Sequence, residues 1–224
     1  MTSHFLAAME EILWLYSLPY DPNRPVVCFD ERPCFLIGDR VEPIAMQKGQ
    51  IKKEHYAYAK NGSCALLAAI EPLTGHRITQ VQQQRTKREF TMICQAIDKA
   101  YPDAEEVGVV LDNLNTHKKG AFYDYLPADE ARALAQKLVF YYTPISASWL
   151  NMIEIEFSAL TRQCLNRRIA TMAELKKEVL AFFDQRSKQQ VKIEWLFTID
   201  DCREKLNSKY AIVNDANTKF AQYL

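Results

Sequence analysis

Two aspartates each follow a short apolar segment of the chain. Asp30 ends the run at 26–29, and Asp112 ends the run at 107–111. Such runs are typical of central strands buried on both faces, and groups at strand carboxyl ends converge on one crevice of an open α/β sheet. Two carboxylates held close together repel each other unless a cation lies between them. Mg²⁺ prefers carboxylate, water and phosphate oxygens, and a pair of such ions can cleave a phosphodiester bond.

A third acidic ligand is needed, because an aspartate after a strand is also a common turn cap. Two glutamates, Glu154 and Glu156, lie in a segment whose apolar residues recur at helical spacing from Leu150 to Cys164. At about 100° per residue, the two glutamates fall on opposite borders of this apolar stripe. Periodicity therefore does not choose between them, and either could equally be a solvated flank of the helix.

The segments around these acids predict an α/β arrangement. Residues 26–29 form a first strand, with 34–37 continuing it or pairing with it. Asn61-Gly62 supplies the positive φ angles of a tight turn, so 56–60 and 63–70 are expected to form a hairpin. Further strands are expected at 77–82, 107–111 and 138–142, and helices at 5–16, 87–101, 118–134, 149–166, 171–186 and 199–206. The order is three strands, helix, strand, helix, strand, helix.

The composition is that of an ordinary globular chain. Lys and Arg number 28, as do Asp and Glu, so the net charge is zero, whereas a free-standing DNA-binding domain is usually basic. No apolar run approaches the roughly 20 residues that span a bilayer, and the start of the chain, with Glu10 and Glu11, lacks the basic beginning of a signal peptide. None of the six cysteines forms a C-x-x-C pair, so we expect free thiols in a reducing cytoplasm and no zinc site.

Three ordered segments carry a family resemblance. The segment V-V-C-F-D-E-R-P at 26–33 resembles the first catalytic block of IS630-family transposases, in the IS630/Tc1-mariner superfamily. The segment V-V-L-D-N-L-N-T-H at 109–117 resembles the second block, in which D-N is followed by a histidine. The segment at 142–154 resembles the third, which ends in L-N-x-x-E. The tracts E-P-L at 71–73 and Q-R-T at 84–86 also resemble the family.

This resemblance implies an RNase H-like fold, in which a five-stranded mixed sheet is flanked by helices. It also implies that Asp30, Asp112 and Glu154 are the catalytic residues and the ligands of two Mg²⁺ (or Mn²⁺) ions, because Glu154 rather than Glu156 matches L-N-x-x-E. The implied reaction hydrolyses a DNA strand at the end of a mobile element and then directs the exposed 3′-OH at target DNA. No covalent enzyme intermediate is implied.

The resemblance also suggests a domain plan and partners. We expect an N-terminal helix and linker at 1–24, the catalytic domain at 25–190 and a C-terminal helical tail at 191–224. The expected partners are the transposon ends and target DNA, a second copy of the chain, and a separate N-terminal helix-turn-helix portion that such transposases normally carry. Two departures are that 41 residues separate Asp112 from Glu154, more than in many relatives, and that Met152 stands where many members have proline.

Several other residues are candidates for supporting roles. Glu31 points away from Asp30 across the strand, and Asn113 and His117 could orient water or phosphate, or simply form a turn. Asn151 lies one helical turn before Glu154. Basic residues that could contact phosphates are Lys48, Lys52, Lys53, Arg85, Lys87, Arg88, Lys118, Lys119, Arg162, Arg167 and Arg168. Each basic cluster taken alone is more often a solvated face. For Trp149, a core or helix-start role is favoured over base stacking.

Two alternative functions remain open. The chain could be an inactive or truncated transposase remnant that only binds DNA or regulates, which zero net charge and the lack of a helix-turn-helix region favour. It could also be another RNase H-like nuclease, for example one acting on RNA–DNA hybrids. The D-N-x-x-x-H and L-N-x-x-E blocks argue against that second alternative.

Overall fold

The computed structural model describes residues 2–51 and 55–217. Its centre is a five-stranded mixed sheet in the order β3-β2-β1-β4-β5. β1 pairs with β2, and β2 with β3, in antiparallel fashion, whereas β1–β4 and β4–β5 are parallel. The strands are β1 (Val26–Asp39), β2 (Tyr58–Glu71), β3 (His76–Gln82), β4 (Val107–Leu111) and β5 (Leu138–Tyr142). The expected five-stranded mixed sheet is therefore confirmed.

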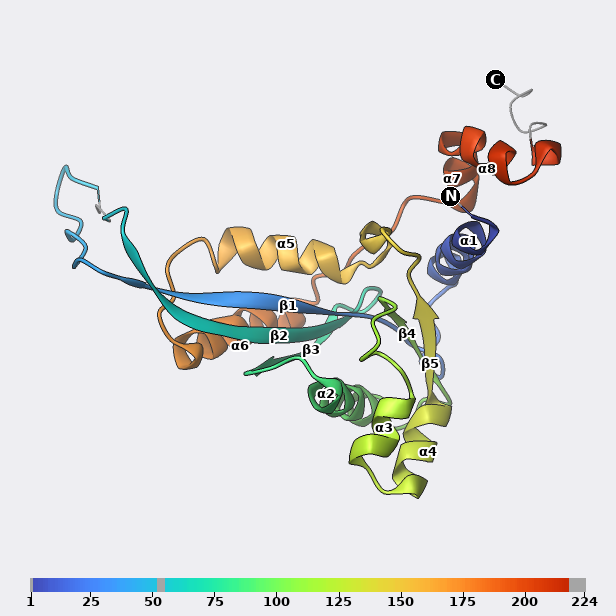
Figure 1. Cartoon of the computed structure of the whole chain (residues 1–224), viewed down its shortest axis with the longest axis horizontal. Coiled ribbons are helices and arrows are strands. Elements are labelled where there is room, and N and C mark those ends of the chain that lie inside the picture. The colour runs from blue at the N-terminus through green and yellow to red at the C-terminus, as the bar shows by residue number, and fades with distance from the viewer. Residues whose placement is uncertain (1, 52–54, 218–224) are drawn as a thin grey trace.

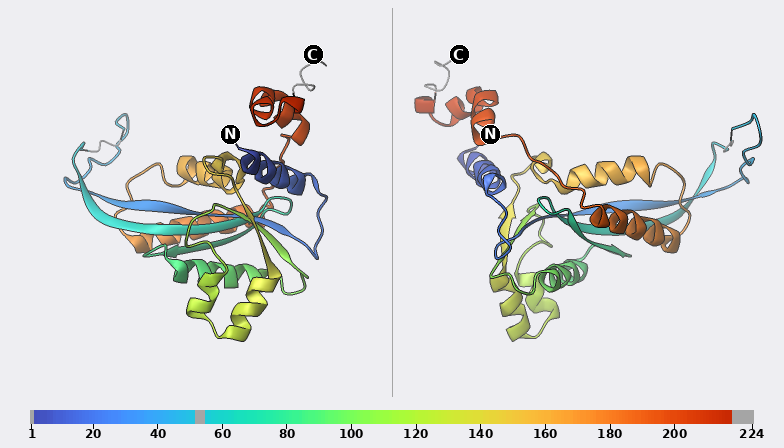
Figure 2. Two further views of the ribbon diagram at one scale, coloured as in Figure 1. Left: turned by 45° about the vertical axis from the view of Figure 1, so that its right-hand side comes forward. Right: turned by 180° about the vertical axis from the view of Figure 1, so that it is seen from behind.

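Helices cover both faces of this sheet (Figures 1 and 2). One face carries α2 (Lys87–Ala100), α3 (Gly120–Tyr125) and α4 (Ala128–Lys137). The other face carries α1 (Ser3–Ser17), α5 (Ile153–Gln163) and α6 (Met172–Lys188). Two short helices, α7 (Ile199–Lys205) and α8 (Asn207–Val213), follow α6. No helix in the described part of the chain is long and apolar enough to cross a membrane.

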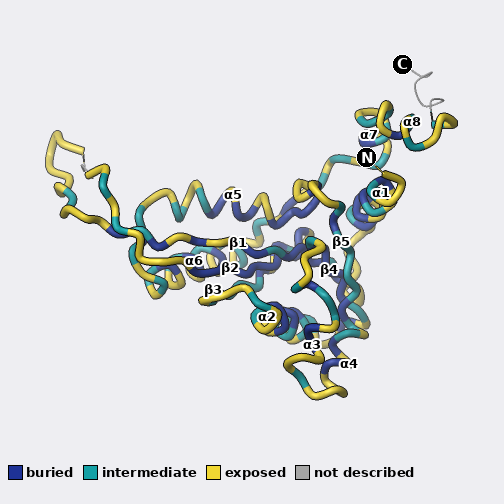
Figure 3. Tube along the Cα trace, viewed as in Figure 1, coloured by how far each residue is buried: buried dark blue, intermediate teal, exposed yellow. Residues whose placement is uncertain are grey.

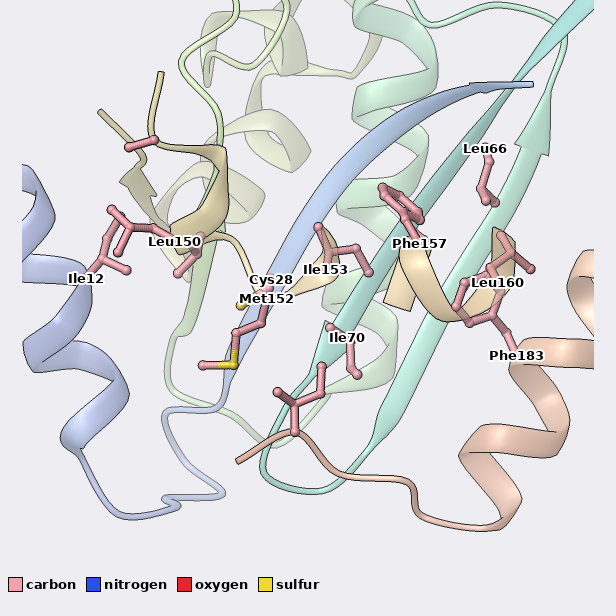
Figure 4. Close-up of a cluster of buried hydrophobic side chains, with 14 of the residues drawn as sticks. Ile12, Cys28, Leu66, Ile70, Leu150, Met152, Ile153, Phe157, Leu160 and Phe183 are labelled. Carbon is pink, nitrogen blue, oxygen red and sulfur yellow. The ribbon is translucent and has the colours of Figure 1, made fainter. Parts of the chain in front are cut away.

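Alternate residues of the central strands feed two separate hydrophobic cores. Val27 and Phe29 pack with α2, α3 and α4, while Cys28 packs with α1, α5 and α6. This follows from the period of two along a strand, which sends neighbouring side chains to opposite faces. Figure 3 shows β4 buried along its length. Figure 4 shows Cys28 and Ile70 of the sheet beneath Met152, Ile153 and Phe157.

The first strand continues into the 34–37 segment, one of the two alternatives that the sequence left open. It does not end at Asp30 but continues through the 34–37 segment to Asp39, paired with β2 along its length. Only its first three residues, Val26–Cys28, pair with β4. The β1–β2 ribbon therefore extends beyond the rest of the sheet (Figure 1). The apolar run predicted only the stretch that is covered on both faces.

The predicted hairpin across Asn61-Gly62 is wrong. β2 runs through both residues, which together face Leu36 of β1 where the pairing shifts between Phe35 and Ile37. Gly62 has φ +111°, and the side-chain amide of Asn61 donates to the Ala170 carbonyl at 2.9 Å. The pair thus forms a β-bulge, which uses the same backbone freedom of glycine as a tight turn does.

The predicted helix at 149–166 is broken at its start. A 3₁₀ turn at Ser148–Leu150 is followed by Asn151 and Met152, and α5 begins only at Ile153. Glu154 consequently lies in the first turn of α5. The segment expected as a helix at 118–134 forms two short helices, since α3 ends before Pro127 and α4 begins after it.

The two ends of the described chain lie together. Arg203 of α7 pairs with Glu10 of α1 at 2.7 and 2.8 Å, and the Tyr210 hydroxyl donates to the same carboxylate at 2.6 Å. Buried Cys202 contacts Met9 through their sulfur atoms, 3.4 Å apart. The N-terminal helix α1 and the C-terminal helices α7 and α8 therefore lie side by side (Figure 2).

Candidate active site

The sheet register brings Asp30 and Asp112 together. Cys28 of β1 lies opposite Val110 of β4, and each aspartate follows its strand neighbour by two residues. Asp30 and Asp112 are therefore side by side at the point where β4 ends and β1 continues without it. Asp30 has the same strand parity as Cys28, which faces α5.

Glu154 reaches this point because the start of α5 is fastened to β1. The side-chain amide of buried Asn151 donates at 2.8 Å to the carbonyl of Phe29, the residue before Asp30. The Asn151 side-chain oxygen accepts from the Ile153 amide at 3.4 Å. Glu154, in the first turn, is exposed to solvent. Figure 1 shows α5 running along β1 from this point.

Glu156 has a different environment from Glu154. Its carboxylate is fully buried and accepts from Arg77 of β3 at 2.9 Å and from Arg186 of α6 at 2.8 and 2.9 Å. Burial opposes ionisation, but the hydrogen bonds with Arg186 and Arg77 outweigh it and lower the pKa of Glu156. Glu156 therefore ties α5 to β3 and α6 and is not available to a site at Asp30.

The electrostatics of Asp30 reflect its two acidic neighbours. Burial, together with the charges of Asp112 and Glu154, raises the pKa of the Asp30 carboxyl to about 7, against the opposing hydrogen bond from the Glu31 amide and the charge of His117. The Glu31 amide donates to the Asp30 carboxylate at 2.6 Å. The three acids are thus close enough to affect one another.

A buried histidine links Asp112 to Glu31. The His117 Nδ1 hydrogen-bonds the Asp112 carboxylate, and its Nε2 lies 3.3 Å from the Glu31 carboxylate. The ring packs between Phe29 and Phe90, with centroids at 5.4 and 4.7 Å. Burial alone would lower the pKa of His117, but the hydrogen bonds with Asp112 and Glu31 raise it to about 9. Glu31 and His117 thus hold Asp112 from behind.

These residues suit a hard divalent cation by their chemistry. All three acids offer carboxylate oxygens, which Mg²⁺ and Mn²⁺ accept as ligands. Within the described ranges, no three His, Cys, Asp or Glu side chains are gathered tightly enough to hold a metal ion. Asp30 is engaged by the Glu31 amide, and Asp112 by His117. A cation bound between the acids would offset their mutual repulsion.

The remaining sequence candidates fall into two groups. Lys118 bonds the Asn113 side chain and lies over the Tyr142 ring at 4.1 Å, so both residues flank Asp112. Arg85 and Arg162 are exposed, the first beyond the end of β3 and the second two turns along α5 from Glu154. Lys52 and Lys53 lie outside the described residues.

Other basic candidates are engaged within the chain. Arg167 pairs with Glu174 and Glu178, Arg168 pairs with Asp39, and Lys87 pairs with Asp124. Trp149 is the middle residue of the 3₁₀ turn, is 46% exposed and stacks on Trp195 with ring centroids 6.4 Å apart.

One residue that holds α5 in place, Arg32, is not among the candidates from the sequence. Arg32 donates to the Phe157 carbonyl at 2.8 Å and bonds the Thr161 hydroxyl, so it holds the middle of α5 on β1. The signal was present, since Arg32 lies two residues from Asp30 and shares its face of the strand.

Comparisons with known proteins identify the family and the fold of the chain. A family described as DDE superfamily endonuclease matches residues 25–176, more than half of the chain. No curated protein sequence matches it. The fold is similar to three solved Mos1 complexes. These are the Mos1 mariner paired-end complex with Mn (TM-score 0.55, 13% identity, covering 83% of this chain and 58% of that one), the same complex with Mg (0.53, 13%, 85% and 62%) and the Mos1 transposase paired-end complex with left transposon end (0.53, 12%, 98% and 64%).

At such low identity these likenesses show the fold alone, and the chain spans about three fifths of the length of these structures. They confirm the α/β, RNase H-like class expected from the sequence. The match of the family to both strands that carry the aspartates and to the helix that carries Glu154 shows that the chain belongs to the DDE superfamily of endonucleases.

Proposed function

We propose that this chain is the catalytic part of an IS630-family transposase, with a catalytic unit at 25–190. In this proposal it cleaves DNA at the ends of a mobile element and joins the exposed 3′-OH to target DNA. The observation that supports the proposal is that the charges of Asp112, after β4, and of Glu154, at the start of α5, act on the carboxyl of Asp30 in β1.

The three acids would hold two divalent ions, Mg²⁺ or Mn²⁺. Ions bound there would activate the attacking oxygen and stabilise the leaving oxygen of a phosphodiester displacement. The side chains around them position the ligands. His117, backed by Glu31, orients Asp112, and Asn151 fixes the first turn of α5, which presents Glu154.

The substrate proposed is DNA, both transposon ends and target. The exposed Arg85 and Arg162, together with Lys118 beside Asp112, are the basic groups best placed to contact its phosphates. We further propose that the chain acts as a homodimer on paired ends and works with a helix-turn-helix portion that reads them. The Mos1 structures are paired-end complexes, which supports this arrangement.

A nicking assay on supercoiled plasmid DNA with Mg²⁺ or Mn²⁺ tests the proposal. Asp30→Asn, Asp112→Asn and Glu154→Gln should each lower nicking by about 100-fold or more, because each removes a metal ligand. Glu204→Gln is the matched control on exposed α7 and should leave nicking unchanged. Full nicking activity of Glu154→Gln would show that Glu154 is not a ligand in the site. Absence of any metal-dependent nicking, also when the chain is joined to a reader portion, would favour the inactive remnant.

A further inference from the structure

A cavity lies at the end of the sheet opposite the three acids. It has a volume of about 500 Å³ and reaches down to Val26 and Gly108, where β1 and β4 begin. Its walls come from the end of α1, the connection into β1, the turn after β2 and residues 193–195 after α6. Pockets for small ligands typically measure about 300–1,000 Å³, so this cavity has the size of a small-molecule site.

Aromatic rings form much of its wall. Trp14 and Tyr20 stand at the rim, each 49% exposed, and Trp195 and Tyr141 line the cavity with them. Trp195 is fixed in place, since its ring lies 5.2 Å from that of Tyr16 and its Nε1 donates to the Phe197 carbonyl at 2.7 Å. The faces of such rings attract cations, and indole does so most strongly.

The charged groups of the wall are mostly acidic. The described lining residues with carboxylates are Asp21, Glu71, Glu106 and Glu194, and the one with a guanidinium is Arg24. Arg24 is already engaged, because it lies 3.5 Å from Glu105 and 3.8 Å from Glu106. Three carboxylates of the wall therefore have no ion-pair partner in the described part of the chain.

The most buried of these carboxylates is that of Glu71, which is 3% exposed. Its hydrogen bonds within the described ranges come from the hydroxyl groups of Thr74 and Tyr101, which carry no positive charge. The negative potential extends across the cavity to its rim. Burial and then the charges of Glu71 and Asp21 raise the pKa of the Tyr20 hydroxyl.

This wall is built largely from residues outside the family core. Trp14, Tyr20 and Trp195 lie before or after the stretch at 25–176 that the family shares. The acidic lining also argues against a role in holding DNA, since phosphates would be repelled. The cavity therefore calls for a ligand of its own.

We propose that this cavity binds a small organic cation, a protonated or quaternary amine carried on an apolar body. The aromatic rings receive the apolar body and the face of the ammonium group. The carboxylates of Asp21, Glu71 and Glu194 supply the field that attracts its charge. A neutral molecule of the same shape would use only the apolar wall, and an anion would be repelled.

Calorimetric titration of the full chain with three matched probes tests this inference. The probes at pH 7 are 2-phenylethylamine, 2-phenylethanol and phenylacetate, which share an aromatic body and differ in charge. We expect the amine to bind at least about tenfold more tightly than the alcohol, and phenylacetate to bind most weakly. Equal affinity for amine and alcohol, or no saturable binding of the amine, would overturn the proposal.

Variants locate the binding. Tyr20→Leu and Trp14→Leu each remove a rim ring while keeping an apolar side chain, and each should weaken amine binding several-fold. Tyr125→Leu is the matched control, because Tyr125 is also 49% exposed but lies on α3, away from the cavity. Glu71→Gln removes the buried charge and should narrow the preference of the cavity for amine over alcohol. If all three changes leave amine binding as it is, the amine binds elsewhere and the assignment fails.

Discussion

The carboxyl group of Asp30 is held against its own preference for ionisation. Its pKa in the fold is about 7, against 3.8 for an unperturbed aspartate. Between these two values the folded state keeps a proton that the unfolded state releases, so the free energy of unfolding falls as pH rises from about 4 to about 7. Below about pH 4 the Asp30 carboxyl is protonated in both states, so its burial no longer lowers the free energy of unfolding.

Replacing Asp30 with asparagine should therefore stabilise the metal-free protein. At pH 8 we expect Asp30→Asn to raise the free energy of unfolding by roughly 1–3 kcal/mol, after discounting for partial solvation. At pH 4 the gain should vanish. Urea unfolding in EDTA at both pH values measures it. A variant no more stable than the parent at pH 8 would mean that Asp30 is not strained by its acidic neighbours.

The His117 ring hydrogen-bonds the Asp112 carboxylate, and the effect of this bond can be measured as a change in metal affinity. Partners behind metal ligands commonly contribute about 10–100-fold to metal affinity. His117→Gln and Glu31→Gln should each weaken Mn²⁺ binding within that range, and both keep a polar group inside the buried cluster. His4→Gln, at an exposed position in α1, is the control. Unchanged Mn²⁺ affinity in both buried variants would reduce the cluster to a packing role.

At the scale of the element, α5 separates two glutamates by function. Glu156 pairs with both Arg77 and Arg186 inside the fold, and removing one partner of a buried ion pair costs about 3–5 kcal/mol. We expect Glu156→Gln to unfold at markedly lower urea concentration, yet to keep nicking activity per folded molecule. Glu154→Gln should keep the urea stability of the parent and lose nicking activity. Loss of nicking without loss of stability in Glu156→Gln would contradict this division.

Periodicity could not have distinguished these two glutamates, because both border the same apolar stripe. What distinguishes them is which neighbour each border meets, Arg77 and Arg186 on one side and the strand acids on the other. The same limit applies to Asn61-Gly62. The backbone freedom of Gly62 was correctly inferred, but a turn and a bulge use it equally, and only the pairing of β2 with β1 decides.

At the scale of the whole molecule, the sequence predicted the strand and helix order well. The central strands are marked by unbroken apolar runs, and the order of elements restricts the sheet topology. The contacts between distant segments left no comparable signal. Nothing local in Glu10 indicates that it meets Arg203 and Tyr210 almost 200 residues later.

That long-range contact makes a prediction about how the molecule opens. α7 and α8 join α1 through the cluster of Glu10, Arg203 and Tyr210 above the Met9–Cys202 contact, at one end of the core that α1 shares with the sheet. β1 and β4 instead contribute to both cores. Glu10→Ala should therefore raise amide hydrogen exchange in α7 and α8 by about tenfold or more, while exchange in β1 and β4 stays slow. Glu11→Ala, exposed on the same helix, is the control. If the central strands lose protection together with α7 and α8, the terminal helices unfold with the sheet rather than as a separate unit.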